Sequence, residues 1–270
     1  MAAPKHTTGY EPLNTLKPVA QDIWIIDGPA VQFYGMPFST RCTIVRLQNG
    51  DLWVHSPTFL ADTLRAELNA LGPVRHLIAP NWLHYVNIAD WQAAFPEAVS
   101  YAAPGVCERA ARQGKALNFD HILEQGAEAP WEKQIDQMIV KGSKRHREAV
   151  FFHRRSSTLI LTDLIENFET AKLPAWLRPL VWLAGIDDSD GKMPPDMRLT
   201  FRRTPLAESV EAMIAWQPQR LILAHGRWYR RDAVDELRRA FRRILRDREW
   251  IAAMDRMKDV RSDQDGSTKG

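Results

Sequence analysis

The sequence predicts a layered α/β fold whose sheets mix antiparallel and parallel strands. Two pairs of short β-rich segments are joined by turn residues, which is typical of antiparallel hairpins. Other short apolar segments are separated by amphipathic helices, which is typical of parallel strands joined by crossovers. The 270 residues and the apolar fraction of 45 % allow a sizeable core. We expect one domain over residues 1–270, with an ordered core at about 16–250 and polar tails.

The first half of the chain alternates strand and helix signals. After an irregular lead-in to about residue 18, a strand is expected at Asp22–Asp27. A hairpin is expected at Arg41–Leu47 and Leu52–His55, because Asn49-Gly50 suits the positive φ of a type I′ turn. Next come a helix with leucines at helical spacing, a strand, a helical turn and a strand, at residues 58–71, 76–79, 91–95 and 98–102.

The second half opens with residues 105–132, where the pattern is ambiguous and a helix followed by a loop is expected. A second hairpin is predicted at Ala149–His153 and Thr158–Thr162. The remaining elements are a tryptophan-rich helix, a loop, a helix capped by Thr204-Pro205, a buried strand and a long helix, at residues 173–186, 187–195, 204–216, 220–224 and 232–254. The polar tail that follows is expected to be disordered.

The composition excludes several classes of protein. A net charge of +3 is only mildly basic, which excludes a histone-like protein. Cys42 and Cys107 are too few for a disulfide framework or a zinc ribbon, so two reduced thiols are expected. The N-terminus has no apolar stretch typical of a secretory signal, and residues 173–186, the longest apolar segment, are interrupted by Arg178 and prolines. We therefore expect a cytoplasmic protein.

Polar side chains follow the ends of four predicted strands, and these are the clearest functional signal. They are His55, Asn81 with His84, Asp163, and His225. A strand holds such a side chain at the rim of a sheet, where loops can surround a ligand. Imidazoles and carboxylates that converge there can hold a divalent metal. Each also has a simpler interpretation: a strand-end hydrogen bond, a turn or helix cap, or a loop histidine.

Two phrases around these residues resemble the metallo-β-lactamase superfamily. They are LILTDL, which contains Asp163, and LILAHGR, which contains His225. In that superfamily one strand ends in an Asp that bridges two metals and a later strand ends in His-Gly. The resemblance implies a four-layer αββα sandwich of mixed sheets. More narrowly, the chain is similar to an uncharacterised family of that fold, a domain of unknown function, through the phrases DIWIIDGP, WVHSP, APNWLH, AVFFHR, LILTDLIENF, DMRLTFRR and ILAHGR.

The chain departs from the first metal motif of the superfamily, His-x-His-x-Asp-His. This motif falls on residues 80–85, where its two early histidines are replaced by Pro80 and Trp82. His84 stands in the place of the Asp, and Tyr85 in the place of the last His. A two-metal centre needs about five or six protein ligands, so at most one metal is expected.

The later motifs of the resemblance define which ligands remain. A Gly-His motif falls on Gly142-Ser143, so its histidine is missing too, and Asp27 lies where an Asp orients the site rather than binding metal. The expected ligands are the three remaining side chains, His84, Asp163 and His225. Zn²⁺, Mn²⁺ or Fe²⁺ suits such a set, with a water in the open position. A pocket without any metal stays open as the alternative.

This set predicts a hydrolase-like protein that acts on an ester, thioester, amide or phosphodiester in a small-molecule substrate. Asp163 would bind the metal and orient the water, and Tyr85 would donate a proton or stabilise an oxyanion. Five further residues are expected near the pocket: His55, Asn81, Ser143, His153 and Arg227. The alternative is a non-catalytic module that binds a small-molecule ligand with the same rim residues.

Two surfaces suggest other partners. The last helix carries arginines from Arg238 to Arg248, which suggests a nucleic-acid-binding member, but acidic neighbours favour a solvated face. No base-stacking aromatic residue is interleaved, so nucleic acid is not expected. Residues 173–186 suit a lid over an apolar substrate, a helix on a membrane surface, or a helix packed on the sheet. The absence of a Gly-rich phosphate loop and of G-x-S-x-G argues against nucleotide-dependent enzymes and α/β-hydrolases.

Overall fold

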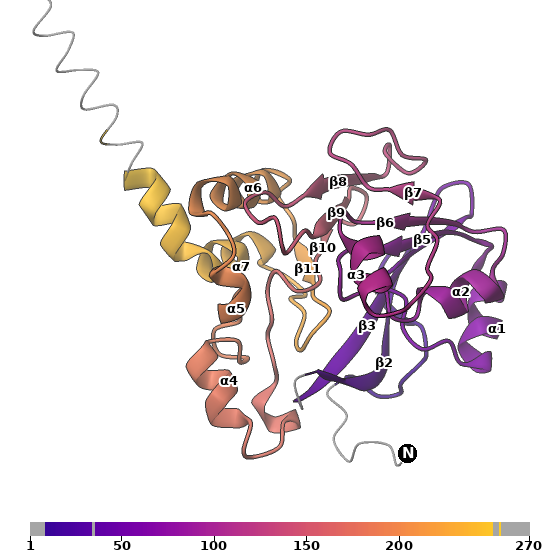
Figure 1. Ribbon diagram of the computed structural model, residues 1–270, viewed down its shortest axis with the longest axis horizontal. Coiled ribbons are helices and arrows are strands. Elements are labelled where there is room, and N and C mark those ends of the chain that lie inside the picture. The colour runs from indigo at the N-terminus through magenta and orange to yellow at the C-terminus, as the bar shows by residue number, and fades with distance from the viewer. Residues whose placement is uncertain (1–8, 34–35, 251–253, 255–270) are drawn as a thin grey trace, which may run out of the picture.

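The computed structural model describes residues 9–33, 36–250 and 254, in which two mixed sheets are flanked by helices (Figure 1). Strands of the first sheet lie side by side in chain order, antiparallel from β1 to β4 and parallel from β4 to β7. They are β1 Lys17–Ala20, β2 Ile23–Phe33, β3 Met36–Arg46, β4 Leu52–His55, β5 Val74–Ala79, β6 Val99–Ala102 and β7 His121–Ile122.

The second sheet has the order β11-β10-β9-β8. Its strands are β8 Ile135–Ile139, β9 Ala149–His153, β10 Thr158–Ile160 and β11 Arg220–Ile222. The β8–β9 and β9–β10 pairs are antiparallel, whereas β10 and β11 are parallel. Both predicted hairpins are confirmed, β3–β4 and β9–β10. The type I′ turn expected at Asn49-Gly50 was wrong: Gly50 has a positive φ of 89°, but Asn49 does not have the positive φ that this turn also requires, and Gly50 N–H donates to the carbonyl of Leu47 instead at 2.9 Å.

α1 and α2 cover the outer face of the first sheet, and α6 and α7 cover that of the second. The helices are α1 Asp62–Leu71, α2 Ile88–Ala94, α3 Val106–Arg112, α4 Arg178–Ala184, α5 Pro195–Arg198, α6 Arg203–Ala215 and α7 Ala233–Ala240, with a 3₁₀ turn, η1, at Thr170–Lys172. None of the helices in the described ranges is long and apolar enough to cross a membrane.

Three hydrophobic clusters separate the four layers. Side chains of alternate residues point to opposite faces of a strand, so each strand contributes to two clusters. In β9, Phe151 packs between the sheets and Val150 packs toward α6 and α7. In β4, Trp53 packs between the sheets and Val54 packs toward α1 and α2. This arrangement confirms the αββα sandwich of mixed sheets that the resemblance implied.

The structure corrects several predicted boundaries in the sheets. The expected irregular lead-in contains β1, and the unpredicted strand β8 forms an edge of the second sheet. β1 has no clear alternation of apolar residues, and its extended backbone is stabilised by pairing with β2. β2 and β3 also run past the predicted ends, because their pairing continues to Phe33 and Met36.

Three helix predictions were wrong in part. The helix predicted over 173–186 is α-helical only at Arg178–Ala184, because Pro179 suits the first turn of a helix but not its interior. α6 begins at Arg203, and Thr204 makes no capping hydrogen bond. α7 begins after Asp232 as predicted but ends at Ala240, and helical residues 242–250 follow a turn. The first eight residues and the tail after Met254 lie outside the described residues.

Candidate metal centre

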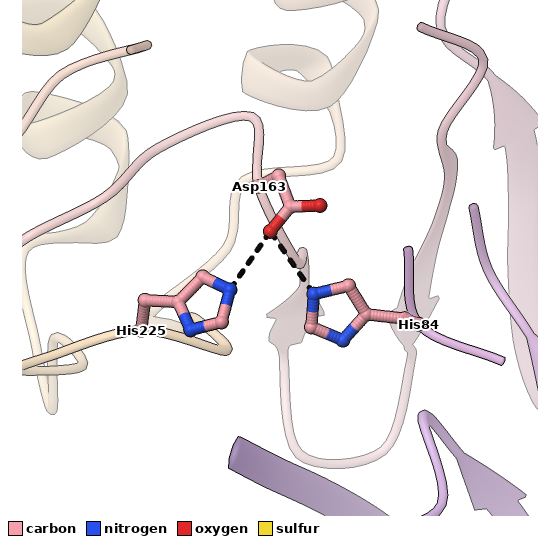
Figure 2. Close-up of side chains that lie close together, drawn as sticks. All are labelled: His84, Asp163 and His225. Carbon is pink, nitrogen blue, oxygen red and sulfur yellow. Dashed lines mark hydrogen bonds and ion pairs between the residues drawn. The ribbon is translucent and has the colours of Figure 1, made fainter. Parts of the chain in front are cut away.

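Three side chains from three loops meet where the rims of the two sheets approach each other (Figure 2). Asp163 follows β10 and His225 follows β11. Ile160 pairs with Ile222 in these parallel strands, so the two side chains follow at the same offset on the same edge. His84 comes from the loop after β5 in the first sheet. The structure thus brings together all three ligands that were expected from the sequence.

Both histidines point their Nε2 atoms at one carboxylate oxygen. His84 Nε2 and His225 Nε2 each lie 3.0 Å from Asp163 Oδ1, and the two rings are 5.2 Å apart between centroids. The potential ligand atoms of the three residues all lie within 4.8 Å of one another. A single cation placed among them can reach one nitrogen from each ring and one carboxylate oxygen.

The carbonyl of Ser39 determines which nitrogen of His225 carries a proton. His225 Nδ1 lies 2.7 Å from the carbonyl oxygen of Ser39. A carbonyl oxygen only accepts, so Nδ1 must donate, and the neutral ring then has a lone pair on Nε2. That lone pair faces Asp163 Oδ1, which is also an acceptor. The pair needs a positive charge, either a second ring proton or a metal ion, and this backbone hydrogen bond is typical of metal-binding histidines.

His84 is held from behind by a serine. Its Nδ1 lies 2.7 Å from Ser56 Oγ, and Ser56 adopts a left-handed φ of 55° directly after β4. Burial alone would lower the pKa of His84, but the charge and hydrogen bond of Asp163 outweigh it and raise the pKa. Burial alone would raise the pKa of Asp163, but the two histidines hold it well below its usual range. The cluster therefore has an ionised carboxylate that favours a cation.

Asn81 ties the carboxylate of Asp163 to the loop that carries His84. Its Nδ2 donates to Asp163 Oδ2 at 2.7 Å and to Thr162 Oγ1 at 2.8 Å. Its Oδ1 accepts the backbone N–H groups of Leu83 at 2.8 Å and His84 at 3.0 Å. Asn81 is buried and is not among the residues that line the cavity, so it lies behind the expected ligands and positions them.

Two buried glutamates that the sequence analysis missed surround Asp163. Glu148 accepts the backbone N–H groups of Thr162 at 2.7 Å and Asp163 at 3.0 Å. Burial and then the charge of Asp163 raise the pKa of Glu148 to about 7. The same two causes raise the pKa of Glu166 well above its usual value. Glu166 comes directly after the segment LILTDLI. An acidic residue next to such an apolar segment is the sequence feature that could have pointed to it.

A buried ion pair fixes the backbone on both sides of His225. Arg41 Nη1 donates to the carbonyls of Leu223 at 2.6 Å and Gly226 at 3.0 Å, and Arg41 Nη2 lies 2.7 Å from Asp27 Oδ1. Gly226 has a φ of 79°, and a Cβ there would lie 1.9 Å from the carbonyl of Asn167. Only glycine therefore fits after His225. Asp27 orients the site through Arg41, as the resemblance implied.

A cavity of about 300 Å³ opens onto the three ligands. Its lining combines apolar and aromatic side chains with polar and charged ones, which suits a small ligand that has both apolar and polar parts. The lining comes from the hairpin β2–β3, the loop after β5, α3 and its C-terminal end, the loop before β9, the segments after β10 and β11, and the start of α5. It comprises Val31, Gln32, Phe38, Trp82, Leu83, His84, Tyr85, Val86, Arg109, Gln113, Arg145, His146, Asp163, Glu166, Pro194, Asp196, Met197 and His225.

Comparison with known families identifies the chain. A family described as a domain of unknown function, DUF4336, matches residues 20–196, which is more than half of the sequence. The chain belongs to this family. No curated protein matches it. Membership in DUF4336 confirms the narrower resemblance drawn from the sequence, and it carries no assigned activity.

Solved structures show the wider fold of this DUF4336 member. The DIM-1 metallo-β-lactamase is 12 % identical, with a TM-score of 0.61 over 84 % of this chain and 96 % of that one. A metallo-β-lactamase from Hirschia baltica is 17 % identical, with a TM-score of 0.56 over 84 % and 96 %. FIM-1 from Pseudomonas aeruginosa in its mono-zinc form is 13 % identical, with a TM-score of 0.59 over 90 % and 98 %. The chain has the metallo-β-lactamase fold.

His55 and Tyr85 lie in different surroundings from those expected. His55 is 2 % exposed, stacks on Trp53 at 5.5 Å between ring centroids, and does not line the cavity. Burial and then the charge of His84 lower the pKa of His55 to about 3. Tyr85 lines the cavity, but its hydroxyl donates to Gln113 Oε1 at 2.6 Å. Its role as a proton donor stays a prediction.

Three other expected pocket residues are absent from the cavity lining among the described residues. Ser143 Oγ donates to Thr200 Oγ1 at 3.1 Å, and His153 Nδ1 lies 2.8 Å from Ser156 Oγ. Arg227 pairs with Asp188 at 3.0 Å. Each of these side chains makes a hydrogen bond or ion pair within the structure and does not contact the cavity. This agrees with the simpler interpretation, in which polar residues at strand ends and in loops make local hydrogen bonds.

The two surfaces that suggested other partners are the arginine-rich C-terminal helices and residues 173–186, and the first exposes charged groups whereas the second exposes apolar ones. Several arginines of the C-terminal helices pair with acids, which leaves less charge for phosphate groups: Arg238 with Asp235, Arg239 and Arg242 with Asp190, and Arg248 with Glu211. In α4, Leu177 at the N-cap and Val181 are buried, whereas Trp182 is 64 % and Leu183 is 73 % exposed. The membrane surface predicted for residues 173–186 stays a prediction.

Proposed function

We propose that this chain is a metal-dependent hydrolase whose mononuclear centre is formed by His84, Asp163 and His225. The observation that carries the proposal is that two hydrogen-bond acceptors, His225 Nε2 and Asp163 Oδ1, face each other in the cluster. In a neutral His225 ring, the hydrogen bond from Nδ1 to the Ser39 carbonyl leaves a lone pair on Nε2, which lies 3.0 Å from the ionised Asp163 carboxylate. A cation between them removes the conflict, and three protein ligands with an open position are typical of catalytic zinc sites.

The surrounding residues fit the needs of hydrolysis. A divalent cation bound there would lower the pKa of its water and polarise the scissile carbonyl or phosphoryl group. Asp163 stays ionised and can orient a nucleophilic water through hydrogen bonding. Glu166 lines the cavity with a raised pKa, so its carboxyl group keeps a proton that it can donate to the leaving group. The substrate class is a small ester, thioester, amide or phosphodiester.

A non-catalytic ligand-binding module is the second candidate, and one observation favours it. If His84 and His225 are both protonated, their Nε2 atoms donate to Asp163 Oδ1 at 3.0 Å, and the cluster is closed without a metal. The cavity of about 300 Å³ would then serve as a hydrogen-bonding pocket.

Metal content measured by mass spectrometry separates the two candidates. The protein is purified without chelator and without metal-affinity resin, together with Asp163→Asn, His225→Ala and His121→Ala. His121 is exposed on β7 and serves as the control histidine. We expect about one equivalent of a transition metal in the wild type and in His121→Ala, and none in the two site variants, because each removes one of three ligands.

A metal-free wild type with all four proteins equally folded would overturn the hydrolase proposal and favour the binding module. If metal is present, a screen of chromogenic esters, thioesters and phosphodiesters follows. Activity that disappears in Asp163→Asn and persists in His121→Ala would support hydrolysis at this centre.

A further inference from the structure

Two arginines of the cavity lining lie against the ring of Trp82. Arg109, on α3, has its guanidinium carbon 4.9 Å from the ring centroid, and the guanidinium carbon of Arg145, in the loop before β9, lies 5.6 Å from it. The ring of His146 packs on Trp82 edge-on at 5.0 Å. All four side chains line the cavity that holds the candidate ligands. The cluster therefore concentrates positive charge on one wall of the site.

The two guanidinium groups have N–H donors that are available to bind a ligand. A guanidinium stacked on an aromatic ring uses its flat face, so its in-plane N–H groups stay available. Within the described ranges, neither side chain forms an ion pair or hydrogen bond with a carboxylate, whereas Arg227 and Arg239 pair with acids. Trp82 thus orients two cations without neutralising them, and planar N–H pairs of this kind match the oxygens of an oxyanion.

The rest of the cavity defines the other parts of a ligand. Apolar side chains form much of the lining: Val31, Phe38, Leu83, Val86, Pro194 and Met197. Asp196 also lines it, and a carboxylate there would repel an anion placed beside it. These surroundings leave the wall formed by Arg109, Trp82 and Arg145 as the position for a negative group.

We propose that Arg109 and Arg145 bind an oxyanion, carboxylate or phosphate, on a small ligand whose apolar body fills the rest of the cavity. This deepens the proposed function, on which it rests for the reaction, by naming a substrate class: anionic esters, thioesters, amides or phosphodiesters. Binding of the anion itself requires only the two guanidinium groups. It can therefore be tested without turnover and without metal.

The test measures the equilibrium binding of three probes to protein treated with chelator. Ligand-observed NMR detects the binding. The probes are 4-phenylbutyrate, phenylphosphonate and the neutral 4-phenylbutyramide. The variants are Arg109→Gln/Arg145→Gln and the matched control Arg112→Gln/Arg147→Gln, which removes the same charge from the same helix and the same loop. Arg112 and Arg147 are exposed and do not line the cavity. Circular dichroism verifies that both variants are folded.

We expect both anions to bind the wild type at least about tenfold more tightly than the amide, because charge-assisted hydrogen bonds exceed neutral ones. The Arg109→Gln/Arg145→Gln variant should lose this preference and the control should keep it. The tighter anion then identifies carboxylate or phosphate as the recognised group. Equal binding of amide and anions, equal affinity in the two double variants, or anion binding that appears only when metal is restored would overturn the proposal.

The outcome is independent of the metal measurement. Anion binding in a protein without metal would support the arginine site while the hydrolase proposal fails. A metal-loaded, active protein without the anion preference would support the hydrolase proposal and overturn the arginine site.

Discussion

The two sheets contribute unequally to the candidate centre. From the second sheet, Asp163 and His225 follow parallel strands whose residues pair in register, and both keep the residue types of the resemblance. From the first sheet, the loop after β5 supplies one ligand, His84. Positions 80 and 82, which carry histidines in the superfamily motif, are Pro80 and Trp82 here. Trp82 faces Arg109 and Arg145 instead.

The difference shows that loss of ligands on the first-sheet side has not left that side unstructured. Asn81 anchors the loop to Asp163, and Ser56 holds His84 Nδ1. On the proposed function, the second-sheet side would supply two of the three metal ligands, whereas the first-sheet side would supply one ligand and contact the substrate. Four predictions test this division.

The largest effect is expected from Asp27→Asn, which breaks the buried ion pair with Arg41 that holds the backbone around His225 on the second-sheet side. Asp27 and Arg41 are 0 % and 2 % exposed, so the variant leaves a buried guanidinium without its counter-charge. We expect the free energy of unfolding, measured with urea, to fall by about 3–5 kcal/mol. Metal content should fall as well, because Arg41 holds the carbonyls that flank His225.

Asp22→Asn is the matched control for this variant. Asp22 pairs with Arg46 and Arg155, which are 42 % and 54 % exposed, so its loss should cost less than about 1 kcal/mol. Equal losses in Asp27→Asn and Asp22→Asn would contradict the role of the buried pair.

A pH effect is expected from His55, at the end of β4 on the first-sheet side. Its folded-state pKa of about 3 lies below the unfolded value, so the unfolded chain binds more protons between these two pH values. The contribution is complete above the unfolded pKa, and stability is lost as pH falls toward about 3. Between pH 7 and pH 5 this amounts to about 2 kcal/mol, which His55→Phe should abolish.

Urea unfolding at both pH values, in chelator, measures this difference for the wild type and His55→Phe. His121→Phe is the control, since His121 is exposed and its substitution should change the pH dependence by less than about 0.5 kcal/mol. A pH dependence unchanged in His55→Phe would show that other groups cause it.

An intermediate effect on metal affinity is expected from Ser56→Ala. This variant removes the 2.7 Å hydrogen bond that orients His84. Loss of such a partner behind a metal ligand typically weakens binding about 10–100-fold, measurable for Zn²⁺ by competition with a chromophoric chelator. Ser156→Ala removes the same type of bond from His153, which is outside the cavity lining, and should leave the affinity unchanged. Equal affinities would imply that His84 needs no support.

The smallest effect is expected from Tyr85→Phe. The single hydroxyl proton of Tyr85 already goes to Gln113 Oε1 at 2.6 Å, so we expect the rate of hydrolysis to change by less than about tenfold. A fall of about 10²–10⁴ would instead support a role as proton donor. Tyr101→Phe is the control, since Tyr101 is buried between the sheets and does not line the cavity.

The pattern of strand ends could predict some of the site but could not rank its candidates. His55 is the last residue of β4 and His84 follows β5, and the sequence alone does not distinguish these two strand-end histidines. The alternation along β4 puts His55 on the same face as Trp53, which packs between the sheets, so this histidine lies in the core. Arg109 and Arg145 carried no local signal, because an isolated arginine on a helix or in a loop is usually solvated.

By itself the sequence determined that Asp163 and His225 follow buried strands, and parallel pairing of these strands then places both side chains at one rim. It also determined the family and the loss of the early histidines. The tertiary structure alone decided that His84 reaches Asp163 from the other sheet and that the carbonyl of Ser39 fixes the proton of His225. These contacts join residues far apart in the chain, and their geometry depends on how the two sheets pack, which no local pattern of residues encodes.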